Sequence, residues 1–189
     1  MTLLHDVRLW LVRHAPVAGA TGAIHAIDAP ADTSDVAILA DLRAKLPAGA
    51  AVFASPSIRT LATAAALGLE PIAEPEFSEQ DFGDWIGRRH DDLAREGGTA
   101  YHDFWRTPAE SRPPGGESFA GQVARVRAGF ARLPAGDVVL VVHSGTIRAA
   151  LAIALDLSPE QALRFSIEPL SLTRIDRVAG SWHVVSVNR

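Results

Sequence analysis

The stretch that decides the fold is Asp137-Val138-Val139-Leu140-Val141-Val142, which runs directly into His143-Ser144-Gly145. Every residue from Val138 to Val142 is apolar, so a strand there carries apolar side chains on both faces. Strands that are buried on both faces are typical of parallel sheets covered by helices. The stretch therefore predicts a central strand of an α/β protein, followed by a helix.

Apolar runs alternate with helical patterns on both sides of this strand. Two further strands are expected at 7–12 and 51–54, and apolar residues three or four positions apart predict the helices 35–46, 58–69, 122–133 and 146–155. The first of these helices is expected to have Asp32, Thr33 or Ser34 as its N-cap. The runs 170–178 and 182–187 flank Ala179-Gly180-Ser181 and predict an antiparallel hairpin. This order predicts a three-layer α/β/α sandwich with a mostly parallel central sheet and an antiparallel C-terminal edge.

The pattern loosens between residues 71 and 118, where glycine and proline are frequent. We interpret this segment as a small helical insertion over the C-terminal edge of the sheet, within a single domain that spans residues 1–189. Trp85 and Trp105 lie in it. They are expected to pack in its core rather than to stack on a substrate, because large aromatic side chains usually bury.

Composition excludes several classes of function. The 189 residues include no cysteine, seven histidines, and a single lysine among the 18 basic residues. Disulfides, thiolate zinc sites and a cysteine nucleophile are therefore excluded. A formal net charge of −4 argues against nucleic-acid binding, and polar residues interrupt each apolar stretch before it reaches the length of a membrane span. We expect a cytoplasmic protein that binds neither nucleic acid nor membrane.

Two strands end in histidine at the edge where α/β folds bind ligands. His14 follows the strand 7–12 and His143 follows the central strand, while the turn at Ser55-Pro56 places Arg59 at the start of a helix. Ligands of open parallel sheets lie outside the carboxyl ends of the strands, beside helix N-termini. His14, His143, Arg13 and Arg59 should therefore converge into a cationic pocket for a dianion such as phosphate. The alternatives are a core histidine at position 14 and a helix-surface arginine at position 59.

Five blocks of the sequence resemble the histidine phosphatase superfamily, in its phosphoglycerate-mutase-like branch. They occur in the family's order between residue 7 and about residue 150. Within that branch the chain is most similar to α-ribazole phosphatases of cobalamin assembly, through the Pro-Pro-Gly-Gly-Glu-Ser stretch and the strand 170–174. The five blocks are Leu11-Val12-Arg13-His14, Ser55-Pro56-Ser57-Ile58-Arg59-Thr60, Glu79-Gln80-Asp81-Phe82-Gly83-Asp84-Trp85, Pro114-Gly115-Gly116-Glu117-Ser118 and Val142-His143-Ser144-Gly145-Thr146-Ile147-Arg148.

The resemblance implies a metal-independent phosphomonoester hydrolase that needs no cofactor and acts on a small phosphorylated metabolite, with α-ribazole 5′-phosphate as a candidate. It implies that His14 is the nucleophile and carries a transient phosphoryl group. Arg13, Arg59 and His143 would hold the phosphate oxygens. Glu79 would be the general acid and then the base.

Two of these assignments leave alternatives open. Asp81 and Glu76 compete with Glu79 for the role of general acid, because carboxylates in loops are usually only solvated. Ser144 could lend its hydroxyl or its backbone N–H to the phosphate, or only cap the helix that follows. Asp28 and Arg112 are expected to be surface charges rather than substrate contacts.

Departures from the family pattern keep other functions open. Ala15 stands where the family has glycine, so that a positive φ there would be strained. Ile86 stands where the family often has glutamate, and Ala26 replaces another family glycine. These changes motivate a non-catalytic phospholigand-binding module as an alternative. A phosphoglycerate-type mutase is the other alternative, although the short insertion favours hydrolysis, because a mutase must exclude water.

Two further expectations concern metals and partners. A metal phosphohydrolase built on His90-Asp91 and His102-Asp103 is disfavoured, because Gly97-Gly98 interrupts any helix between the two pairs. The C-terminal strands could pair across a homodimer.

Overall fold

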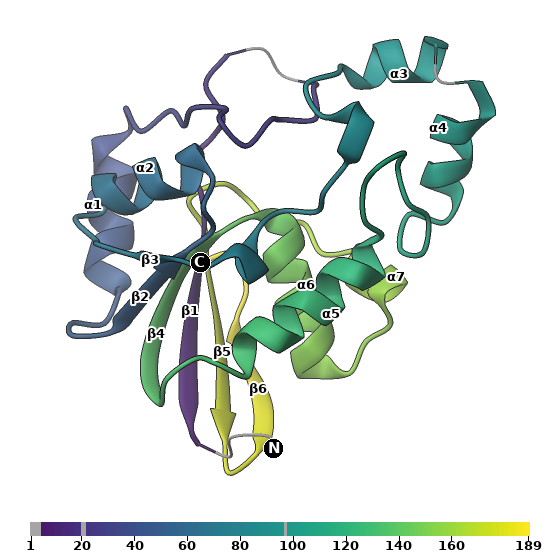
Figure 1. Cartoon of the computed structure of the whole chain (residues 1–189). Helices are drawn as coiled ribbons and strands as arrows, with labels where there is room; N and C mark the ends of the chain where they lie inside the picture. Colours follow the sequence, from purple (N-terminus) through teal and green to yellow (C-terminus); the bar gives the residue numbers. More distant parts are fainter. Residues whose placement is uncertain (1–4, 20–21, 97) are drawn as a thin grey trace.

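The computed structural model describes residues 5–19, 22–96 and 98–189. Within them lies a six-stranded sheet of order β3-β2-β4-β1-β5-β6 (Figure 1). β3, β2, β4 and β1 are parallel, whereas β5 runs antiparallel to both β1 and β6, which confirms the predicted mixed sheet and its C-terminal hairpin. The strands are β1 (Val7–Arg13), β2 (Ala51–Ala54), β3 (Ile72–Ala73), β4 (Gly136–Val142), β5 (Leu172–Val178) and β6 (Ser181–Ser186).

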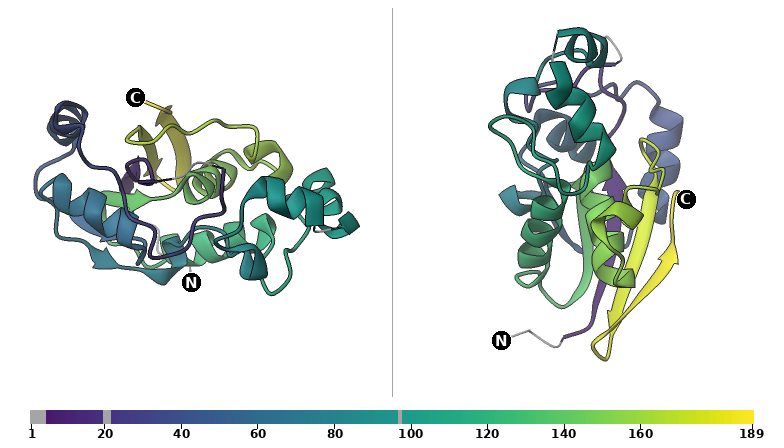
Figure 2. Two further views of the ribbon diagram at one scale, coloured as in Figure 1. Left: turned by 90° about the horizontal axis from the view of Figure 1, so that it is seen from above. Right: turned by 90° about the vertical axis from the view of Figure 1, so that its right-hand side faces the viewer.

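Helices cover both faces of the sheet, as the apolar run in β4 predicts. Val138, Leu140 and Val142 pack into one apolar core, and Val139 and Val141 pack into a second core on the opposite face. The first core lies under α5 (Phe119–Phe130), α6 (Ser144–Leu155) and α7 (Pro159–Ala162), and the second lies under α1 (Val36–Lys45) and α2 (Ile58–Ala66) (Figure 2). None of the described helices is long and apolar enough to cross a membrane.

Three helix starts differ from the sequence prediction. The N-cap of α1 is Asp35, whose side chain accepts a hydrogen bond from the backbone N–H of Ile38, so the prediction of residues 32–34 was wrong. Asp32 instead accepts from the backbone of Ser34 in a preceding turn. α5 starts at Phe119 because Ser118 caps it, and α6 starts at Ser144. In α5 and α6 a glycine in the first turn weakens the helical pattern.

The segment 71–118 contributes a short edge strand and a small helical unit. β3 adds a strand beside β2 at one edge of the sheet, which the hydrophobic pattern of residues 71–118 did not predict. The short 3₁₀ turns η1 (Pro75–Phe77) and η2 (Gly83–Trp85) then lead to α3 (His90–Glu96) and α4 (Gly98–Arg106), which lie beyond the carboxyl ends of β1 and β4 (Figure 1). Trp85 is buried against Leu93 and Phe104, as expected. Trp105 is 46% exposed, so the prediction that it packs in the core was wrong.

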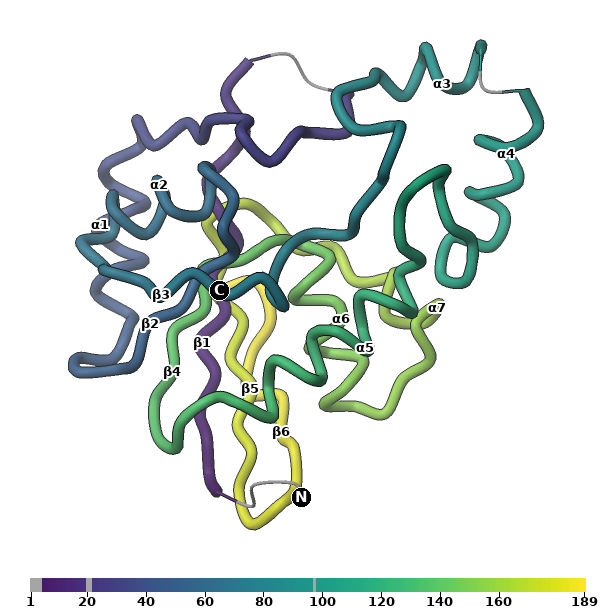
Figure 3. The backbone as a smooth tube through the Cα atoms, in the orientation of Figure 1, coloured from purple at the N-terminus to yellow at the C-terminus, as the bar shows by residue number. Residues whose placement is uncertain are grey.

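The loop after β1 connects this helical unit to the sheet edge. Ile24 packs in the same cluster as Trp85, and Ala23 forms an isolated antiparallel bridge with Arg89. Figure 3 shows the two backbone segments side by side at this point. The loop therefore runs between α3 and the first turn of α2, where Ile58 N–H donates to the carbonyl of Ile27.

Gly83 marks a close crossing of two backbone segments and yields a stability prediction. A Cβ at Gly83 would lie 2.1 Å from the carbonyl oxygen of Pro114 and 2.5 Å from the backbone nitrogen of Gly116. We expect Gly83→Ala to destabilise the protein by about 2 kcal/mol or more beyond its backbone cost, because neither segment can move without the other. Urea unfolding measures this difference.

Gly87→Ala is the matched control. Gly87 also has a positive φ, of 81°, but a Cβ there meets nothing within 4 Å. Both substitutions thus carry the left-handed backbone cost of roughly 1–2 kcal/mol, and only the one at Gly83 adds a clash. Equal stability losses in the two variants would show that the crossing tolerates a methyl group.

Candidate functional site

His14 lies directly after β1, and its ring is held in one tautomer. Its Nδ1 lies 2.6 Å from the carbonyl oxygen of Ala15. A carbonyl only accepts hydrogen bonds, so Nδ1 carries the proton and Nε2 keeps its lone pair. The side chain is 6% exposed, and burial, reinforced by the charges of Arg59 and Arg13, lowers the pKa of His14 to about 3. The imidazole is therefore neutral near pH 7 and has a lone pair on Nε2.

His143 lies beside His14 because their strands are neighbours. In the parallel pairing of β1 with β4, Arg13 is opposite Val142, so the next residue of each strand is a histidine. The two ring centroids are 5.1 Å apart. Nε2 of His143 is 2.8 Å from Oγ of Ser55, at the end of β2, and its buried Nδ1 has no hydrogen-bond partner among the described residues. Complete burial holds the pKa of His143 well below its usual value.

Two arginines lie beside the histidine pair, and a third, Arg148, lies close to Arg13. Arg59, in the first turn of α2, is 5% exposed and donates from Nη1 to the carbonyl of Ala26 at 2.7 Å, so its alternative interpretation as a surface residue is wrong. Nη1 of Arg13 donates to the carbonyl of Ile167, while its buried Nε has no partner in the described part of the chain. Arg148 of α6 donates from Nε to Phe165 O at 2.7 Å.

The arginines share one carboxylate. Burial lowers the pKa of Arg13, Arg59 and Arg148, and the negative charge of Glu79 opposes that shift for each of them. Guanidinium groups stay protonated in proteins, so the cluster is cationic near neutral pH. A group of buried cations around two neutral histidines is suited to bind an anion with several oxygen atoms.

Glu79 reaches this cluster from the irregular segment after η1. Its Oε1 accepts from the backbone N–H of Gln80 and from Nε2 of Gln122, each at 3.1 Å. Its Oε2 lies 3.3 Å from the backbone nitrogen of Gly145 and 3.5 Å from Oγ of Ser144, at the N-terminus of α6. That position is electrostatically favourable for a carboxylate. The N-cap residue of α6 is His143, so the alternative in which Ser144 only caps the helix does not hold.

The two competing carboxylates lie elsewhere. Asp81 is exposed and its Oδ1 accepts from the backbone of Gly83. Glu76 forms an ion pair with Arg132 on the outside of the molecule. Among these three candidates, Glu79 is the one that the structure brings to the arginines and to the residues that follow His143.

Sequence reasoning missed Ser55, Gln122 and Arg148. Gln122 gave a signal, because a glutamine at helical spacing with Val126 and Phe130 lies on the apolar face of its helix, where it is fully buried. Arg148 follows His143 on the same helix but carries no distinguishing spacing. Ser55 ends a strand of the parallel sheet, which places it at the ligand-binding edge.

Other residues singled out from the sequence have ordinary surroundings. Ala15 is fully buried and is not in the left-handed region, so the strain considered for it does not arise; its N–H donates to Oγ1 of Thr63 at 2.9 Å. His90 shares a hydrogen bond with the hydroxyl of Tyr101, and His102 with the carbonyl of Ala94. Within the described ranges, no group of three or more histidine or acidic side chains is arranged to hold a metal ion. Asp28 and Arg112 are exposed.

Comparison with known proteins identifies the family. The sequence profile of the histidine phosphatase superfamily (branch 1) matches residues 9–189. The chain belongs to the histidine phosphatase superfamily. It is 36% identical over 103 residues to a 2,3-bisphosphoglycerate-dependent phosphoglycerate mutase of Azorhizobium caulinodans, an alignment that covers 51% of this chain and 50% of the mutase. It thus spans about half the length of that curated relative.

Solved structures extend the similarity to nearly the whole chain. A putative alpha-ribazole-5′-P phosphatase from Escherichia coli superposes with a TM-score of 0.87 at 25% identity, over 97% of this chain and 96% of that one. The mycobacterial glucosyl-3-phosphoglycerate phosphatase gives a TM-score of 0.79 at 26% identity, over 97% and 99%. The fold expected from the resemblance is thereby confirmed.

Gly145 allows a test of how closely Glu79 approaches α6. A Cβ at Gly145 would lie 2.1 Å from Oε1 of Glu79 and 2.8 Å from Oε1 of Gln122. Both are ends of side chains, so Gly145→Ala should fold but displace the Glu79 carboxyl. Because a misplacement of about 1 Å can lower a rate about 100-fold, we expect any phosphoryl-transfer activity that depends on this carboxyl to fall at least tenfold, measured as kcat/KM, with thermal stability nearly unchanged.

Gly121→Ala is the matched control for this substitution. Gly121 also lies in the first turn of a helix, but a Cβ there meets its nearest neighbour, Oγ of Ser118, at an ordinary 3.5 Å. This variant should keep its activity. An active Gly145→Ala enzyme would mean that the position of the carboxyl does not matter.

The depressed pKa of His14 predicts a pH dependence of stability. The folded pKa is about 3 and the ordinary value is 6.5, so unfolding between these values binds a proton. The His14 contribution to the free energy of unfolding is therefore complete above pH 6.5 and is lost as the pH falls from 6.5 toward 3. Urea unfolding at pH 7 and pH 5, in a buffer without phosphate, should show a smaller loss on acidification for His14→Asn than for the wild type. Equal losses would contradict the neutral His14.

Proposed function

We propose that the protein is a phosphomonoester hydrolase that acts through a phosphohistidine on His14. The observation that carries the proposal is the hydrogen bond from His14 Nδ1 to the carbonyl of Ala15, which keeps the Nε2 lone pair available. A neutral imidazole with an available lone pair, surrounded by buried cations, is suited to attack a phosphate dianion. Membership of the superfamily and the similarity to structures of phosphatases support the same conclusion.

The phosphoryl group would lie among Arg13, Arg59 and His143. Nε of Arg13 and Nδ1 of His143 are buried polar atoms without partners in the described residues, and phosphate oxygens would satisfy them. Donation from Nδ1 of His143 requires that Nε2 accept from the Ser55 hydroxyl, which its 2.8 Å separation from Ser55 Oγ permits. These donors stabilise the charge on the transferring group without needing a metal ion.

In the first step, Nε2 of His14 forms a bond to phosphorus while the bond from phosphorus to the alcohol oxygen breaks. Glu79 enters this step as the protonated carboxylic acid, gives its proton to that oxygen and becomes the carboxylate, and the alcohol leaves. In the second step, a water oxygen attacks phosphorus, its proton passes to the Glu79 carboxylate, and the nitrogen–phosphorus bond breaks. The products are the alcohol and inorganic phosphate, and both side chains return to their starting states.

For the substrate we propose a chemical class and two candidate compounds. A small phosphorylated metabolite fits the family. α-Ribazole 5′-phosphate is the first candidate, because the E. coli protein with a TM-score of 0.87 is described as a putative alpha-ribazole-5′-P phosphatase. Glucosyl-3-phosphoglycerate is a second candidate on the same ground. A panel of phosphorylated metabolites that contains both compounds, scored by released phosphate, separates them.

The decisive variant is His14→Ala. We expect its kcat/KM with p-nitrophenyl phosphate and with the best substrate of the panel to fall by about 10³-fold or more, because the nucleophile is lost. Acid-quenched samples of the wild type incubated with a ³²P-labelled substrate should contain an acid-labile phosphoprotein that the variant lacks. His183→Ala, which changes an exposed histidine of β6, is the control and should behave as the wild type.

Turnover by His14→Ala equal to that of the wild type would overturn the proposal. Binding of inorganic phosphate without any turnover by the wild type would instead support a non-catalytic phospholigand-binding protein.

A phosphomutase is the second candidate. The observation that favours it is the 36% sequence identity over 103 residues to the Azorhizobium mutase. Incubation with 3-phosphoglycerate separates the two functions. A hydrolase releases inorganic phosphate, whereas a mutase forms an isomeric phosphoglycerate and releases none. The partial coverage of the mutase, 50% of its length, makes hydrolysis the preferred expectation.

A further inference from the structure

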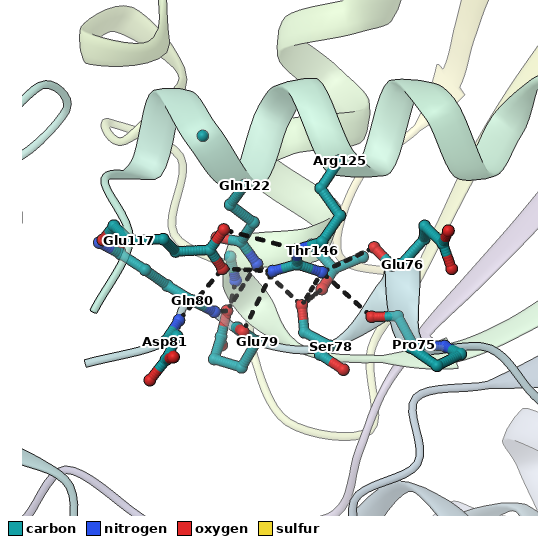
Figure 4. Close-up of polar contacts among 12 residues, drawn as sticks. Pro75, Glu76, Ser78, Glu79, Gln80, Asp81, Glu117, Gln122, Arg125 and Thr146 are labelled. Carbon is teal, nitrogen blue, oxygen red and sulfur yellow. Dashed lines mark hydrogen bonds and ion pairs between the residues drawn. The ribbon is translucent and has the colours of Figure 1, made fainter. Parts of the chain in front are cut away.

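The guanidinium of Arg125, on α5, binds the backbone that leads into Glu79. Nη1 donates to the carbonyl oxygens of Glu76 at 2.8 Å, Ser78 at 3.2 Å and Pro75 at 3.3 Å. Nη2 donates to the carbonyl of Glu79 itself at 3.4 Å. Figure 4 shows this side chain at the centre of a ring of oxygen atoms. One guanidinium thus binds four carbonyls within five consecutive residues.

Glu117 completes the arrangement from the opposite side. Its carboxylate forms an ion pair with Nη2 of Arg125 and also accepts from the backbone N–H of Asp81 at 3.1 Å. Its own backbone exchanges hydrogen bonds with the segment, from Glu117 N–H to Asp81 O at 2.9 Å and from Gln80 Nε2 to Glu117 O at 2.9 Å. We refer to these contacts of Arg125 and Glu117 as the clamp. The clamp holds the chain on both sides of Glu79.

The segment needs such support because no regular structure supplies it. Residues 78–82 lie between η1 and η2, outside any helix or strand. The contacts made by the Glu79 carboxyl itself are 3.1 to 3.5 Å long, so they run from the upper end of the usual hydrogen-bond range to beyond it. The direction of the carboxyl is therefore determined largely by the backbone that carries it. A general acid must lie within hydrogen-bond reach of the leaving oxygen.

We propose that Arg125 is a positioning residue, which through the clamp fixes Glu79 where its proton can reach the leaving-group oxygen. This inference rests on the proposed role of Glu79. All three guanidinium nitrogens already have acceptors, so Arg125 acts through the backbone and not on the substrate. A planar fork serves several acceptors at fixed angles, whereas the ammonium group of lysine is a point charge.

The test is Arg125→Lys, which keeps the charge and removes the fork. We compare kcat/KM for benzyl phosphate, whose alkoxide leaves poorly, with that for p-nitrophenyl phosphate, whose phenolate leaves without a proton. A displaced acid affects only the first substrate, so the ratio of the two values should fall about tenfold, within the range of general acid catalysis. The ratio cancels the concentration of active enzyme, so partial unfolding of the variant does not change it.

Three further variants complete the experiment. Glu79→Gln removes the general acid, so we expect it to lower the ratio more than any of the other variants. Arg127→Lys changes an exposed arginine of the same helix and should leave the ratio unchanged. Glu117→Gln keeps an acceptor for the N–H of Asp81 but removes the ion pair with Arg125. We expect it to lower the ratio less than Arg125→Lys does. If Arg125→Lys does not fold, a fall in the ratio for Glu117→Gln supports the clamp.

The outcomes separate the two proposals. If Glu79→Gln lowers the ratio while Arg125→Lys and Glu117→Gln match Arg127→Lys, the clamp is overturned and the proposed function stands. If Glu79→Gln leaves the ratio unchanged, Glu79 is not the acid and the positioning role falls with it. Loss of turnover in His14→Ala tests the nucleophile independently of both.

Discussion

The parallel pairing of β1 with β4 is the constraint on which the site depends. It places Arg13 opposite Val142, and the N–H of His14 continues the ladder by donating to the carbonyl of Val142 at 2.9 Å. Two histidines that are 129 positions apart in the chain become neighbours because each follows a strand end in the same register. A shift by one residue would turn one of the two rings to the opposite face of the sheet. The apolar run Val138–Val142 does not oppose such a shift, because it is buried on both faces. The ion pair between Arg8 of β1 and Asp137, which lie opposite each other in this register, does oppose it.

The second constraint is the desolvation of a cationic cluster. Arg13, Arg59 and Arg148 would be expensive to bury without acceptors, and each donates to a backbone carbonyl of a loop or turn. The carboxylate of Glu79 offsets part of the positive charge of each arginine. The protein as a whole carries a formal charge of −4, so the positive potential is a local property that anchored side chains maintain. Because the donors are held before a ligand arrives, little reorganisation is needed when charge develops on a bound group.

Local patterns were sufficient to place the part of the site that lies on regular structure. His14, His143, Arg13 and Arg59 follow from strand ends and one helix start, which the alternation of apolar runs already indicates. The N-cap of α1 was missed because the four consecutive residues Asp32-Thr33-Ser34-Asp35 are all good capping residues, and only the fold decides among them. Trp105 was misplaced because a residue's size does not tell which side of α4 packs against Trp85 and Leu93.

Glu79 could be named from the family resemblance but not placed by local rules, because its support comes from far along the chain. Gln122 contacts it across 43 positions and Arg125 contacts its carbonyl across 46. The same helix α5 also receives Phe77 of η1, which is fully buried against Gly129, where a Cβ would lie only 2.7 Å from the ring. The carboxyl is thus carried by a segment attached to α5 and, through Thr146 Oγ1, to α6, whereas the histidines are carried by the sheet and the start of α6. Since α5 and α6 pack in one apolar core, the distance between the carboxylate and the two imidazoles is set by the packing of two helices, and changes in that core should alter it without any change at the residues of the site.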